Sequence, residues 1–183
     1  HIFYNNFLCC LMGLLLPALV SAQTDACGVA STLLTPGVTC TYTAGSTAGF
    51  TDSNQGCVTG TEDDDGFYRF VATATTHTVT VDGAADFDAV LGAYNTCGGT
   101  QPTGGACVDA TAGDGIETLS LSGLTIGTTY FICVYDYAAG SGSFQICITA
   151  PAPPPTNATC ATAASLPCAT VNLAGTTVGT TPV

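Results

Sequence analysis

Six short apolar runs between residues 67 and 149 constrain the fold of this chain most strongly. A short Thr-Ala turn separates the first two, and Gly, Asp or Asn turns bound the others. Apolar and hydroxyl-bearing residues alternate along these runs, which is typical of half-buried β-strands. The one helical candidate, Cys27–Leu34, is short. Many short strands without intervening helices predict an all-β, antiparallel β-sandwich. The expected strands are Phe67–Thr73, His77–Asp82, Phe87–Tyr94, Ile116–Gly123, Thr129–Tyr137 and Ser143–Thr149.

The last two expected strands predict a hairpin around the sequence AAGSG. Side chains alternate between the two faces of a strand, so one apolar row of each strand would face the core. Cys133 and Cys147 would then lie on the opposite face, and a Cys133–Cys147 disulfide is predicted from that register. The core-facing residues would be Tyr130, Ile132, Val134, Phe144, Ile146 and Ile148.

Charged residues are scarce, at 8% of the chain, where soluble domains usually have about 25%. Arg69 is the single Lys or Arg against 13 acidic residues, and the net charge is −12. Nucleic acids and anionic membranes are bound through Lys and Arg. Neither is therefore an expected partner, and the surface must consist largely of Thr, Ser, Gly and Asn.

The N-terminal region has the pattern of a secretory signal peptide. Residues 7–23 hold an apolar stretch too short for a membrane-spanning helix, followed by the small residues Val20-Ser21-Ala22. We predict a signal peptide over residues 1–22, a secreted mature chain and no membrane span. The chain starts with His1, and we expect it to be a fragment.

Nine cysteines follow the predicted cleavage site. In a secreted protein such cysteines predict disulfides. Zinc is not expected, because there is no C-x-x-C pair and His77 is the one histidine of the mature chain. Cys97 and Cys107 flank a Gly-rich loop and are predicted to close it. Three interpretations stay open for Cys57: a free thiol, a bond to another molecule, or a different connectivity.

Two sequence patterns occur twice in the same order. C-x-x-A-x-x-L begins at Cys27 and again at Cys160, and G-x-T-x-G-x-T begins at Gly45 and again at Gly175. Fixed-order self-similarity of this kind predicts tandem modules. Cys168 follows Cys160 as Cys40 follows Cys27, which predicts a Cys27–Cys40 disulfide.

A proline-rich segment separates the two copies. The sequence therefore predicts a module over residues 23–150, an extended linker over 151–156 and the truncated start of a second copy over 157–183.

The order of the motifs resembles that of a known family. "DACGVASTL", "DDGFYRFVAT", "ADFDAVLGAY", "LTIGTTYFICVYDY" and "GSGSFQICITA" follow one another as in pre-peptidase C-terminal (PPC-like) domains, as found in tandem in secreted Bacteroidetes-type surface proteins. The resemblance covers roughly residues 25–149 and the start of the second copy. It implies a non-catalytic, jelly-roll-like β-sandwich; some relatives bind calcium, collagen or polysaccharide. The family often has Trp where this chain has Phe67.

Acidic residues supply the candidate metal site. On an extended segment Asp86 and Asp88 would point the same way, and Asp109 and Asp114 lie in the loop after Cys107. Calcium takes about six to eight oxygen ligands, so these four residues form a candidate calcium site and Ca²⁺ is the one expected cofactor. The alternative is that they are turn residues that bond their own backbone.

The run Glu62–Asp65 is predicted to be a solvated loop before a strand, with a metal site as the alternative. We expect Arg69 to pair with a nearby acid. Tyr135 and Tyr137 are candidate ligand contacts, on the expectation that both are exposed near the hairpin tip.

Catalysis within this chain is not expected. No G-x-S-x-G motif is present, the cysteines are expected to be oxidised, and His77 is predicted to point outward from its strand.

The sequence thus predicts a non-catalytic secreted module for adhesion or substrate targeting in a larger extracellular protein, with a polysaccharide or protein ligand. One alternative is an accessory domain of a secreted peptidase or other hydrolase with its catalytic domain elsewhere. The other is a self-associating subunit of an extracellular fibre or surface layer.

Overall fold

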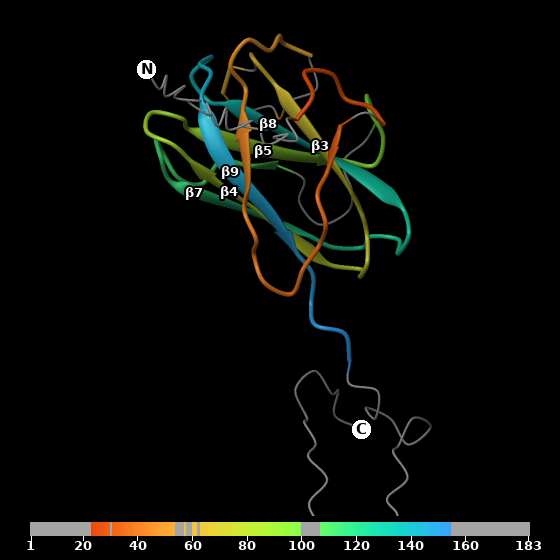
Figure 1. Cartoon of the computed structure of the whole chain (residues 1–183). Helices are drawn as coiled ribbons and strands as arrows, with labels where there is room; N and C mark the ends of the chain where they lie inside the picture. Colours follow the sequence, from red (N-terminus) through yellow and green to blue (C-terminus); the bar gives the residue numbers. More distant parts are fainter. Residues whose placement is uncertain are drawn as a thin grey trace, which may run out of the picture.

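The computed structural model describes residues 23–154 apart from 30, 54–56, 58–59, 62 and 100–106. Two β-sheets pack face to face in this part of the chain (Figure 1). One has the strand order β1-β3-β8-β5-β6 and the other β2-β9-β4-β7. The bounds are β1 Thr32–Leu33, β2 Thr43–Ser46, β3 Gly66–Val71, β4 His77–Gly83, β5 Ala89–Tyr94, β6 Cys107–Val108, β7 Ile116–Leu121, β8 Thr129–Asp136 and β9 Ser143–Thr149.

The predicted β-sandwich is confirmed, and no helix occurs among these residues. All six expected strands are present with shifts of one or two residues at their ends. The helical candidate Cys27–Leu34 is wrong. Thr32 and Leu33 form β1, which pairs in parallel with Tyr68 and Arg69 of β3, whereas the other strand pairs are antiparallel.

The predicted hairpin of the last two strands is also wrong. β8 pairs with β3 and β5, while β9 pairs with β2 and β4, so the chain crosses from one sheet to the other between them. The six residues expected to face the core do so, but from opposite sheets. Periodicity identified the inward face of each strand correctly and could not identify its neighbour.

The main core lies between the two sheets and holds aromatic clusters. The Phe70 ring stacks on Tyr130 with centroids 5.7 Å apart, and Phe87 stacks on Phe144 at 5.3 Å. Phe70 and Tyr130 lie opposite each other on the hydrogen-bonded strands β3 and β8. Phe87 precedes β5 of one sheet and Phe144 belongs to β9 of the other, so the second stack joins the two sheets.

The outer faces of the two sheets differ. A second apolar cluster lies on the outside of the five-stranded sheet, which we call the covered face; it comprises Cys57, Phe67, Val90, Tyr94, Cys133 and Tyr135. Cys27 and Cys107 pack against this cluster. The outside of the four-stranded sheet, which we call the open face, carries the half-buried or exposed Thr78, Thr80, Thr118, Ser120 and Gln145.

Three disulfides correct the predicted connectivity. Cys27 bonds Cys97, Cys40 bonds Cys147, and Cys57 bonds Cys107. The predicted pairs Cys27–Cys40, Cys97–Cys107 and Cys133–Cys147 are therefore wrong. Cys133 and Cys147 belong to strands of different sheets, and each disulfide joins segments at least 50 residues apart instead of closing a local loop. Cys133 is fully buried on the covered face, outside these three bonds.

Residues 151–154 leave the sandwich at the end of β9 without regular secondary structure (Figure 1). The predicted signal peptide and second copy lie outside the described residues. The part of the chain that the structure describes has no helix long and apolar enough to span a membrane.

Candidate functional site

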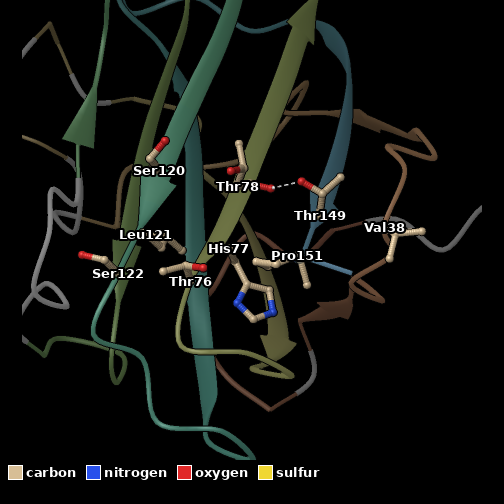
Figure 2. A pocket seen from close by; sticks show the side chains of 10 residues that line it. Val38, Thr76, His77, Thr78, Ser120, Leu121, Ser122, Thr149 and Pro151 are labelled. Atoms are coloured by element: carbon tan, nitrogen blue, oxygen red, sulfur yellow. Dashed lines mark hydrogen bonds between the residues drawn. The ribbon is translucent and has the colours of Figure 1, made fainter. Parts of the chain in front are cut away.

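A hollow of about 510 Å³ opens at the end of the sandwich from which the linker leaves (Figure 2). Its lining is rich in hydroxyl groups, from Thr76, Thr78, Ser120, Ser122 and Thr149. The rest of the lining is largely apolar, from Val38, Leu121, Ala150 and Pro151, with His77 between the two sets. A lining of this kind combines hydrogen-bonding groups with apolar contact area, as ligand pockets do.

Strand register assembles this lining. Thr78 of β4 lies opposite Ser120 of β7 on one side and Thr149 of β9 on the other. The Thr149 hydroxyl donates to the Thr78 carbonyl at 3.5 Å, the contact drawn in Figure 2. Because side chains alternate across a sheet, hydroxyl-bearing residues in opposed positions gather on the same open face.

His77 is buried, so the prediction that it points outward is wrong. Its side chain is 2% exposed and its ring lies 5.2 Å from the Phe70 ring. The Thr73 backbone N–H donates to Nε2 at 3.3 Å, which assigns the proton to Nδ1. Nδ1 is buried without a hydrogen-bond partner among the described residues. Burial lowers the pKa of His77 below its ordinary value.

Two of the four predicted calcium ligands come together with two other acids. Charges of Asp109, Asp136 and Glu117 all act on Asp88, and burial raises the pKa of Asp88 most. The Asp88 backbone N–H donates to Asp136 Oδ2 at 3.1 Å. We call Asp88, Asp109, Glu117 and Asp136 the acidic cluster.

Asp86 and Asp114 do not join this cluster in a common buried site; both are exposed. Asp86 was expected on an extended segment beside Asp88, but it has a φ of 68° in the turn before Phe87, where the Phe87 N–H donates to the Ala84 carbonyl. A turn breaks the alternation of side chains, so the two aspartates lose their common direction.

Sequence reasoning included neither Glu117 nor Asp136 among the candidate site residues. Glu117 is 1% exposed and shares the inward side of β7 with Leu119 and Leu121. The period-two alternation of this strand was the signal that could have identified it, since it puts a carboxylate in an apolar row. Asp136 holds a turn, accepting from the Ala138 N–H at 2.8 Å, besides its bond to Asp88.

The acidic run before β3 is less solvated than expected. Asp65 is fully buried and accepts hydrogen bonds from the Ser53 backbone N–H at 2.9 Å and from the Ser53 hydroxyl. Asp63 and Asp64 are half-buried, and Glu62 lies outside the described residues. Arg69 Nε donates to the Ser31 backbone carbonyl at 2.9 Å, where the sequence had predicted an acidic partner.

The two candidate tyrosines have different environments. Tyr135 is fully buried, its hydroxyl donates to the Cys57 carbonyl at 3.2 Å and it accepts from the Cys57 N–H at 3.1 Å. A ligand contact for Tyr135 is therefore wrong. Tyr137 is 44% exposed and stays a candidate.

Among residues 23–154 as described, no three His, Cys, Asp or Glu side chains form a group that could hold a metal ion by themselves. Fold and site together define a disulfide-stabilised all-β sandwich, with a hydroxyl-lined hollow on its open face and an acidic cluster between the sheets.

No protein-family model matches the chain, and no curated protein matches its sequence. Nine chains of solved structures match, among them the following two. One is the pre-peptidase C-terminal domain of a collagenase from Bacillus anthracis, with 15% identity, a TM-score of 0.39, and coverage of 63% of this chain and 93% of that one. The other is PliG from Aeromonas hydrophila, a periplasmic inhibitor of g-type lysozyme, with 22% identity, a TM-score of 0.30, and coverage of 64% and 97%.

Proposed function

We propose that this chain provides a non-catalytic binding module, which attaches a larger extracellular protein to a polysaccharide or protein ligand. The observation that carries the proposal is the hydroxyl-lined hollow at the linker end of the open face. The order of the sequence motifs, which resembles that of PPC-like domains, is consistent with it.

The compartment follows from the three disulfides. Disulfides persist in oxidising environments and are rare in the cytosol. Each of the three closes a loop of at least 50 residues, so together they connect most of the module. The protein therefore belongs to an extracellular or periplasmic setting.

The net charge of the chain and the lining of the hollow limit the class of ligand that fits. A net charge of −12 repels polyanions. Hydroxyl groups of Thr78, Ser120 and Thr149 can both donate and accept hydrogen bonds, and Val38 and Pro151 add apolar contact. These properties fit a neutral glycan or an uncharged peptide segment.

The experiment uses the whole chain, produced in an oxidising compartment and applied to neutral glycans and extracellular-matrix proteins. Ser120→Trp would fill the hollow from an exposed position. Thr118→Trp is its matched control, because Thr118 is exposed on the same face of β7 and does not line the hollow.

We expect Ser120→Trp to weaken binding of the captured ligand at least tenfold and Thr118→Trp to leave it within twofold. Equal affinities for both variants would contradict the hollow as the binding site. A screen in which neither class of ligand binds would contradict the function itself.

A further inference from the structure

Two carboxylate oxygens in the acidic cluster are buried without hydrogen-bond partners among the described residues, namely Asp88 Oδ1 and Glu117 Oε2. A buried polar atom left unpaired is destabilising, and more so when it is charged. Glu117 as a whole is almost completely buried. Either a bound cation or a proton can compensate oxygens placed in this way.

The loop over residues 110–113 donates hydrogen bonds to both carboxylates. The backbone N–H groups of Ala110 and Thr111 donate to Glu117 Oε1, as does the Thr111 hydroxyl at 2.7 Å. Farther along the same loop, the Gly113 backbone N–H donates to Asp88. The loop thus fixes the orientation of one oxygen of Glu117 and leaves the other available.

The described residues offer no side-chain cation beside these oxygens. Arg69 is the single Lys or Arg of the chain, and Arg69 Nε is bonded to the Ser31 carbonyl at the β1 edge of the five-stranded sheet. His77 is buried in the other sheet at the β4 end beside the linker. The positive charge must come from the solvent.

We propose that Asp88 and Glu117 bind a calcium ion between β5 and β7, with Asp109 and Asp136 adding negative charge around it. Calcium prefers carboxylate and carbonyl oxygens and accepts flexible geometry. No third side chain in the described residues converges on the position, so backbone carbonyls and water would complete the shell.

The expected affinity is low. Extracellular calcium modules with few charged ligands have dissociation constants of about 0.1–1 mM, and two direct carboxylates belong to that range. The site differs from the one predicted from sequence, because Glu117 replaces the exposed Asp86 and Asp114. It does not depend on the proposed ligand-binding function.

The experiment is calorimetric titration of the whole chain with CaCl₂, together with thermal melts in about 10 mM CaCl₂ or EGTA. A ligand bound only by the folded state raises the melting temperature by mass action. We expect a dissociation constant of about 0.1–1 mM and a higher melting temperature in calcium.

Glu117→Gln and Asp88→Asn should each weaken calcium binding at least tenfold. Asp86→Asn and Asp114→Asn, in neighbouring exposed turns, are matched controls that remove the same charge and should stay within twofold. Asp88→Asn serves as the second test if Glu117→Gln fails to fold.

A proton shared by the two carboxylates is the competing explanation. It predicts identical melting in calcium and EGTA, no calorimetric heat, and no difference between cluster and control variants. Any of these three outcomes would overturn the calcium proposal while leaving the glycan or protein ligand of the hollow unaffected.

Discussion

The two outer faces of this sandwich have opposite environments. In the sheet that carries the covered face, every residue of β5 is buried, and so is every residue of β8 except the first. On the open face, β7 alternates strictly between exposed and buried residues, and β4 alternates between half-buried and buried ones. A strand buried on both sides is nearly continuously apolar, whereas a strand with one wet face alternates.

The covered face therefore contributes mainly to stability, and the open face is the one available for binding. The apolar residues of the covered face are shielded in part by Cys27, Cys57 and Cys107, a cover that the Cys27–Cys97 and Cys57–Cys107 disulfides hold in place. The open face needs no cover and keeps its hydroxyl groups in contact with solvent, where the hollow lies. We therefore expect large stability effects from substitutions on the covered face and small ones on the open face.

The largest effect is expected at Phe67, which is fully buried on the covered face. Phe67→Ala removes a buried ring and leaves a cavity, which costs about 3–5 kcal/mol. Its counterpart Thr118→Ala, on the open face, should change the free energy of unfolding by less than about 0.5 kcal/mol. Urea unfolding measures both; a loss below about 1 kcal/mol at Phe67 would contradict a packed cover.

The second prediction compares two disulfides. Replacing Cys57 and Cys107 by Ala is expected to cost about 2–4 kcal/mol. Chain entropy alone predicts that removing Cys40–Cys147 costs more, by about 0.7 kcal/mol, because that bond spans 107 residues rather than 50.

We expect the opposite order, because the Cys57–Cys107 bond also holds the cover and Cys57 belongs to the buried cluster. Unfolding of the two double variants in urea, each compared with the intact chain, measures the order. A larger loss for the Cys40–Cys147 variant would show that the cover adds nothing beyond loop closure.

A smaller effect is expected for Tyr135→Phe. The variant keeps the ring and removes a hydroxyl that bonds both the N–H and the carbonyl of Cys57. Leaving these buried groups unpaired costs about 1–3 kcal/mol. Amide hydrogen exchange at Cys57 should accelerate in step with this loss; unchanged exchange would show that the cover is held by other contacts.

The sequence predicted the parts of this molecule that depend on local periodicity. Strand positions were correct, and so were the inward faces apart from His77, since alternation of residues such as Tyr130, Ile132 and Val134 is a property of each strand alone. Strand neighbours and disulfides were wrong, because crossing between sheets joins Cys40 to Cys147 over a distance that no local pattern records.

The sequence likewise indicated some members of the candidate metal site and not others. The charge of Asp109 acts on Asp88, whereas Asp86 lies in a turn and Glu117 occupies an inward position that the sequence reading did not include. A carboxylate in an apolar row is visible in the sequence, but its partners come from strands that only the fold brings near.

The last and smallest effect is the dependence of stability on pH through His77, which lies between the hollow and the core. Burial lowers the pKa of His77, so the unfolded chain binds a proton more readily than the folded one. The contribution of neutral His77 is complete above its ordinary pKa of about 6.5 and is lost as the pH falls below that value. Protonation would place the charge on Nε2 and break the hydrogen bond from the Thr73 N–H.

Urea unfolding of the intact chain at pH 8, 7, 6 and 5.5 should therefore show a free energy of unfolding that declines below about pH 6.5. His77→Phe keeps a ring beside Phe70 and removes the titrating group, so its profile should be flatter over this range. Its stability at pH 8 sets the baseline and absorbs any packing change. Parallel profiles for the two proteins would mean that the histidine at the linker end has no role in the pH response.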